Sequence, residues 1–176
     1  CRNYAAGAAT GPHTPNATVN VTADGNGTDP VNQGLCPGGA AALLDAFTLQ
    51  TNTGTGPVTA VEVRLAGGSA AALALVEITD DGGGTVYGSA ADPGGDLLSV
   101  PVTMTATSAL VQYKVRITPK AHAAMPAVPG ASHAVTGTVV GLTSTYPKSY
   151  GDSGSATLTV DNLSPGNASW GTITPG

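Results

Sequence analysis

The chain has 176 residues, of which 10% are charged and 4% aromatic, and its formal net charge is −5. This length allows one domain with a substantial core. Six basic residues are too few for a phosphate-binding surface, so nucleic acid and anionic membranes are not expected partners. Abundant Gly, Ala, Thr and Pro favour short strands joined by turns over long helices, and no apolar run is long enough to span a membrane.

Residues 1–40 are predicted to be an N-terminal extension. The chain starts at Cys1, without a methionine or an apolar signal segment, so we expect a mature protein, extracellular or on the cell surface, after removal of a signal peptide. Cys1 and Cys36 lack the spacing of a metal site. Either they form a disulfide, which would contribute roughly 3–4 kcal/mol by closing a loop of about 36 residues, or Cys1 is acylated as in lipoproteins and Cys36 has no partner.

One strand is predicted inside this extension. Polar residues alternate there with four that would share one face, namely Ala17, Val19, Val21 and Ala23. Main-chain hydrogen bonds allow such a strand to join the edge of a sheet. It either pairs with its own domain or inserts into the sheet of the next copy, in which case these four residues form an assembly strand.

Residues 41–163 are predicted to contain eight or nine strands separated by turns. Residues 38–47 have some helical character but can equally lead into a strand at 45–52. Further strands are expected at 58–66, 72–79, 85–88, 97–106, 109–118, 133–144 and 155–162, with a hairpin turn at 80–84 and a proline-rich excursion at 119–132. The predicted fold class is all-β: an antiparallel Greek-key β-sandwich with extended N-terminal and C-terminal segments, the latter at 164–176. Alternation assigns to its core Val61, Val63, Leu65, Val100, Val102, Met104, Val111, Tyr113, Val115, Ile117, Ala156, Leu158 and Val160.

The tetrapeptide Gly-Asp-Ser-Gly at 151–154 resembles the segment around the nucleophile of chymotrypsin-like serine proteases. Such a serine needs a histidine base and an acid that orients it. No acid lies between His122 and Gly151, and only Asp152 lies between His133 and Ser153. We therefore predict that Ser153 lies in a turn, that the chain has no catalytic residue and that it is not an enzyme.

Calcium has slightly more support than other metals. Asp24, Asn26 and Asp29 alternate with glycines as at the opening of a calcium loop, but no bidentate glutamate follows at the required distance. These are weak candidates, because Asp, Asn and Gly are also ordinary turn formers. No other metal site and no cofactor is expected.

Five Asn-x-Ser/Thr sequons are candidate glycosylation sites. All lie in the two predicted extensions, where the backbone would be accessible: Asn16, Asn20, Asn26, Asn162 and Asn167. The alternative is that these sequons arise by chance, because Asn and Thr are common in this chain.

The segment from Pro57 to Leu163 resembles the immunoglobulin-like or fibronectin-like β-sandwich repeats of bacterial secreted and surface-layer proteins. The resemblance rests on VEITDDGGGTVYGS, ALVQYKVRITPKAHAAMP and GSATLTVDNLSP. It implies a structural or spacer role on the cell surface and brings no catalytic residue. A single repeat with two long extensions departs from the tandem arrays of that family.

These features predict a secreted structural protein, a subunit of an extracellular filament or surface layer that assembles by strand exchange. Its partners would be other copies of itself, with other cell-surface proteins as a further class. The alternative is a monomeric adhesin or glycan-binding module that uses residues 119–132 and Trp170. The scarcity of aromatic residues disfavours that alternative.

Overall fold

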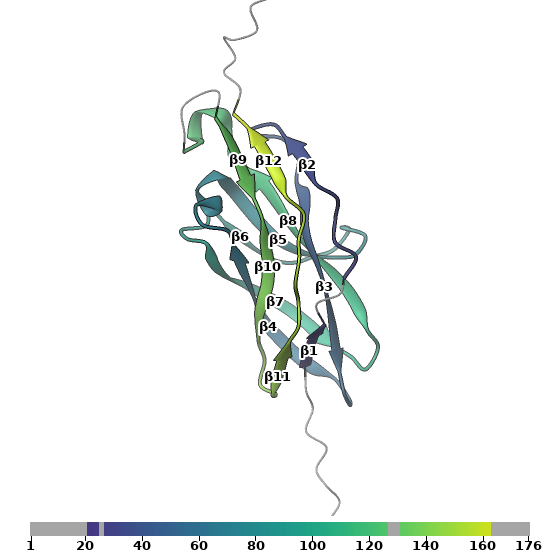
Figure 1. Ribbon diagram of the computed structural model, residues 1–176. Helices are drawn as coiled ribbons and strands as arrows, with labels where there is room; N and C mark the ends of the chain where they lie inside the picture. The colour runs from purple at the N-terminus through teal and green to yellow at the C-terminus, as the bar shows by residue number, and fades with distance from the viewer. Residues whose placement is uncertain (1–20, 25–26, 127–130, 163–176) are drawn as a thin grey trace, which may run out of the picture.

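The computed structural model describes residues 21–24, 27–126 and 131–162, and these form an all-β fold (Figure 1). Two short 3-10 helices, η1 (Ser69–Ala72) and η2 (His122–Ala124), interrupt the strands. Among the described residues no helix is long and apolar enough to cross a membrane. The strands are β1 (Val21–Asp24), β2 (Gln33–Leu35), β3 (Ala42–Thr51), β4 (Gly56–Leu65), β5 (Leu73–Asp80), β6 (Val86–Ala91), β7 (Leu97–Ala106), β8 (Val111–Pro119), β9 (Ser132–Val135), β10 (Gly137–Thr143), β11 (Lys148–Tyr150) and β12 (Leu158–Asp161).

The largest sheet has six strands in the order β11-β1-β3-β8-β5-β6. Pairing is antiparallel throughout, except that β1 runs parallel to β11. Strand β3 pairs with β8, which comes much later in the chain. Between β3 and β8 in the sequence, the chain also forms β4 and β7, which belong to a different sheet. The predicted strand at 45–52 thus falls on β3, and the helical alternative for residues 38–47 is wrong.

Two three-stranded sheets complete the fold, in the orders β10-β4-β7 and β2-β12-β9. The single strand predicted at 133–144 is in fact two strands, β9 and β10, which belong to different sheets. The chain changes sheet at Gly137, where an added Cβ would lie 2.6 Å from Leu65 Cδ2. Glycine therefore allows β10 to approach β4 closely.

Two strands lie in the described part of residues 1–40, the predicted extension. β1 pairs with β3, and β2 pairs parallel to β12. Leu35 of β2 is buried in the common core. The described part of the extension is therefore built into the sheets.

Apolar side chains from all three sheets form one core. The alternation expected in β4, β7, β8 and β12 is confirmed, with one exception: Val111, the first residue of β8, is 38% exposed. Phe47 of β3 stacks on Tyr113 of β8 with ring centroids 5.8 Å apart, and Tyr87 of β6 meets Tyr113 edge-on at 5.5 Å. Contacts between these three rings stabilise the packing of β3, β8 and β6 in the large sheet.

Strand β3 is buried on both faces. Its pairing with β8 shifts register between Leu43 and Asp45, and this bulge leaves the consecutive residues Leu44 and Asp45 both fully buried. On the other face, Gly27 lies so close that an added Cβ would be 2.3 Å from the carbonyl oxygen of Ala46. The bulge and the covering segment together place one charged residue, Asp45, inside the protein.

The β6 edge of the large sheet is held firmly against β7. An added Cβ on Gly88 would lie 1.9 Å from the carbonyl oxygen of Pro101, so the two backbones are in direct contact. The predicted hairpin turn before β6 is confirmed: Gly83 N–H donates to the Asp80 carbonyl at 3.0 Å, and Gly84 N–H donates to Asp80 Oδ1 at 2.8 Å.

Candidate functional site

Strand β1 occupies a slot between β3 and β11. Val21 lies opposite Thr51 of β3 and opposite Lys148 of β11, and Thr22 lies opposite Gln50 and Ser149. Val21 and Ala23 of the predicted assembly strand are thus in β1, whereas Ala17 and Val19 lie outside the described residues. A strand that is paired on both sides forms main-chain hydrogen bonds with two neighbouring strands. Such a strand is well suited to anchor one segment of a structure to another.

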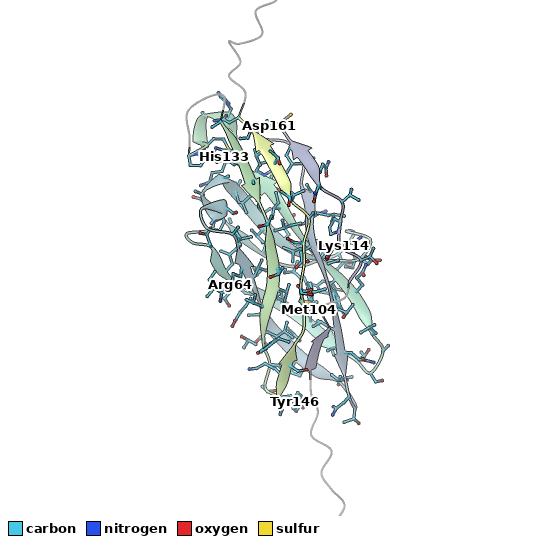
Figure 2. The ribbon with its side chains drawn as sticks, in the orientation of Figure 1. Arg64, Met104, Lys114, His133, Tyr146 and Asp161 are labelled. Carbon is cyan, nitrogen blue, oxygen red and sulfur yellow. The ribbon has the colours of Figure 1, made fainter. Side chains whose placement is uncertain are left out.

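The outer wall of the slot is weakly built. β11 has three exposed residues and, in the described part of the chain, pairs with β1 alone. Tyr150 Oη donates to the Leu142 carbonyl of β10 at 3.3 Å, yet its side chain is 49% exposed. Tyr146, labelled near β11 in Figure 2, is 37% exposed. Exposed aromatic side chains beside a short edge strand make this end of the molecule suitable for contact with another chain.

Cys36 directly follows β2, and its side chain is exposed. It forms no disulfide with a described residue. Its predicted partner, Cys1, lies outside the described residues, so the disulfide stays a prediction.

Of the five sequons only Asn162 is described. It directly follows β12, is 1% exposed, and its backbone N–H donates to the Ala131 carbonyl at 2.9 Å. A buried side chain is not accessible to a glycosylating enzyme, so the structure disfavours Asn162 as an acceptor. The other sequons, at Asn16, Asn20, Asn26 and Asn167, lie outside the described residues.

A carboxyl pair lies between β3, β10 and the 151–157 segment, which joins β11 to β12. Asp45 Oδ2 and Asp152 Oδ2 both accept the backbone N–H of Val139, at 3.1 and 2.9 Å. The two carboxyl groups also hydrogen-bond to each other. Asp45 Oδ1 accepts the N–H of Ala46 at 2.8 Å. Two carboxyl groups in such contact cannot both carry a charge at low cost.

Burial raises the pKa of Asp45 from 3.8 to about 8, and the neighbouring Asp152 charge and hydrogen bond add to the effect. Burial likewise raises the pKa of Asp152, although hydrogen bonds from Asp45 and from the backbone of Val139 and Ser153 oppose that rise. The charge of Asp29 raises the pKa of both groups. Burial and mutual contact therefore both favour the protonated form of the pair.

The predicted calcium ligands are Asp24, Asn26 and Asp29. Asp24 is the last residue of β1, Asn26 lies outside the described residues, and Asp29 lies next to the 151–157 segment, where an added Cβ on Gly154 would contact its Oδ2. No group of three or more acidic, histidine or cysteine residues within the described ranges has the arrangement to hold a metal ion. The calcium hypothesis gains no support from this geometry.

Ser153 is exposed in the 151–157 segment, which is irregular and contains no turn, so the predicted turn at Ser153 is not found. The chemically notable member of its tetrapeptide is Asp152, which contacts the buried Asp45. Sequence reasoning missed this pair. Its one visible signal was Asp45, the single charged residue in the otherwise largely apolar run from Gly38 to Leu49.

The region proposed for glycan binding is described only in part, since residues 127–130 and Trp170 lie outside. A shallow, open groove of about 310 Å³ lies on β2 and β12, lined by Asn32, Gln33, Gly34, Thr157 and Thr159. None of these five lining residues is aromatic, so the groove lacks the ring on which a sugar or a base commonly stacks.

Comparison with known proteins adds no family or relative: no protein-family model matches the chain, and no curated protein matches it significantly.

Proposed function

We propose that the protein is a non-enzymatic structural subunit that assembles outside the cell by exchanging β1 between copies. The observation that carries this proposal is the position of β1, a four-residue strand that lies between β3 and a short exposed edge strand. A segment that fills a slot in its own chain can fill the same slot in a neighbour with the same register, as in domain swapping. Other cell-surface proteins are a further class of partner.

The connection between β1 and β2 is long enough for exchange. Residues 25–32 separate the two strands, and eight extended residues span roughly 26–29 Å. β1 begins at one end of the long axis and β12 ends at the other (Figure 1). Copies linked through β1 would therefore follow one another along that axis, as in a filament.

The proposal includes an immunoglobulin-like Greek-key sandwich as the building block. The strand orders, with β3 beside β8 and β4 beside β7, require the crossovers that such a topology uses. The common core shared by the sheets also supports two packed layers.

Mixed disulfides test the exchange directly. Thr22 of β1 and Gln50 of β3 are register partners, and opposed antiparallel residues lie about 4.5–5.5 Å apart, within disulfide reach. Thr22→Cys and Gln50→Cys would be placed on separate chains, each with Cys1 and Cys36 replaced by serine. After mixing and assembly, oxidation should give a Thr22→Cys/Gln50→Cys heterodimer on a non-reducing gel.

Thr103→Cys, at an exposed position on β7, is the matched control and should not form a dimer with Thr22→Cys. Negative-stain electron microscopy and light scattering of the same samples should show filaments or sheets. Monodisperse monomers together with no heterodimer would overturn the proposal and leave β1 as an internal strand of its own domain.

A further inference from the structure

We propose that Asp45 and Asp152 share a single proton, and that this proton fastens the 151–157 segment, and β11 before it, to β3. The pair joins three parts of the fold that are far apart in the sequence: β3, the Val139 N–H of β10, and the segment after β11. In the shared state the O–H of one carboxyl donates to an oxygen of the other. When the proton leaves, that O–H bond breaks, its electron pair stays on the carboxylate oxygen, and the proton passes to water or hydroxide.

No basic side chain in the described part of the chain acts on the pair. Opposite Asp45, β8 presents the buried apolar residue Val115, and β10 contributes only a backbone N–H. Asp29 lies in the segment before β2, and its negative charge acts on both carboxyl groups. The nearby cations of β8 are engaged elsewhere, Lys114 with Asp81 and Arg116 with Glu77. Loss of the proton would therefore leave two negative charges in contact with little solvent to screen them.

The 151–157 segment depends on this contact. Its other anchors are few: Ser155 Oγ accepts the Gly137 N–H at 3.3 Å, Ala156 N–H donates to the Leu44 carbonyl at 2.8 Å, Thr157 N–H donates to Asn32 Oδ1 at 2.7 Å, and the Thr157 carbonyl accepts the Gln33 N–H at 3.2 Å. All four lie toward β12. Toward β11, Asp152 contributes the hydrogen bonds that tie the segment to the interior. We therefore expect repulsion between the carboxylates to loosen β11 first.

The raised pKa of both groups supports this reading and places the release at alkaline pH. Because β11 forms one wall of the β1 slot, release would also open that slot. This last step rests on the strand exchange proposed above, whereas the shared proton does not and can be tested on the monomer.

The first test is a carboxyl ¹³C NMR titration of the full chain from pH 3 to 10. One carboxyl of the pair should keep its proton at pH 6, and Asp152→Asn should remove the coupling between the two titrations. Asp161→Asn is the matched control, because Asp161 is exposed and its carboxyl group accepts a hydrogen bond from Ser132 Oγ, at 2.7 Å, away from the pair. Full ionisation of both Asp45 and Asp152 below pH 5 in the folded chain would overturn the proposal.

The second test is amide hydrogen exchange at pH 6 and pH 9, corrected for the intrinsic exchange rate. From pH 6 to pH 9, the protection of the amides of residues 148–153 should fall at least about tenfold more than that of the amides of β7. Asp152→Asn, which keeps a neutral hydrogen-bonding partner for Asp45, should hold its protection at pH 9. Equal loss in wild type and Asp152→Asn would contradict the proposal.

Discussion

The two edges of the six-stranded sheet are built in different ways. At one edge, β6 is six residues long, its hairpin turn is closed by hydrogen bonds, and its backbone touches that of β7 at Gly88 and Pro101. At the other, β1 and β11 have four and three residues and are paired in parallel. The first edge is sealed by packing, whereas the second depends on short ladders and on one protonated carboxyl pair. This difference identifies the β11 edge as the part that can open without unfolding the core.

The largest effect is expected at the sealed edge. Gly88→Ala would place a Cβ 1.9 Å from the Pro101 carbonyl oxygen, a backbone atom that cannot move aside easily. The free energy of unfolding, measured by chemical denaturation, should fall by roughly 3 kcal/mol, the upper end for overpacking. Gly94→Ala is the control, because an added Cβ there meets nothing within 4 Å. If both variants were equally stable, the contact between β6 and β7 would not be as tight as described.

The pH dependence of stability should distinguish the two edges. The pKa of Asp45 is about 8 in the folded chain and 3.8 when unperturbed, so the folded state holds the proton more strongly. The resulting stabilisation is complete below pH 4 and is lost progressively until the pH passes about 8. Between pH 5 and 7 the free energy of unfolding should therefore fall, by an amount on the order of 1–3 kcal/mol.

Asp45→Asn should flatten this slope, and Asp161→Asn should not. Denaturation curves in urea, recorded at each pH for the three proteins, give the comparison. A slope of the opposite sign in the wild-type chain would show that Asp45 is ionised in the folded state.

The smallest effects are expected from the ion pairs on the outer face of the large sheet. Arg116 Nη2 lies 3.1 Å from Glu77 Oε2, and both side chains are mostly buried, at 24% and 14% exposure. Glu77→Gln should lower the free energy of unfolding by about 1 kcal/mol, whereas Asp92→Asn should change it by less than about 0.5 kcal/mol. Asp92 pairs with Lys120 but is 77% exposed. Thermal unfolding at low and high salt would measure the loss of stability in both variants. Equal losses would contradict the expectation that the more buried ion pair contributes more to stability.

Much of the fold could be predicted because its strands alternate regularly. Val61, Val63 and Leu65 of β4 are buried while Arg64 is exposed, as the pattern requires. β3 was harder to predict, since a bulge and a covering segment bury both of its faces and remove the alternation. The split of residues 133–144 between two sheets depends on a close approach at Gly137 that only the packed structure reveals.

The carboxyl pair was beyond prediction for a similar reason. Asp45 and Asp152 are distant in the sequence, and their contact depends on the register of β3 against β8 and on the path of the 151–157 segment. A local pattern can indicate that Asp45 is unusual in an apolar run, but it cannot name the partner. Asp152 itself has the sequence context of an ordinary turn residue.

The parallel pairing of β2 with β12 has a mechanical consequence. A stretching force applied at the two ends of the described chain pulls the N-terminal strands and β12 in opposite directions along the long axis (Figure 1). The hydrogen bonds between β2 and β12 then bear the load together, in shear, instead of breaking one after another. A chain of such domains would resist tension through a few short strands and, below alkaline pH, through one proton.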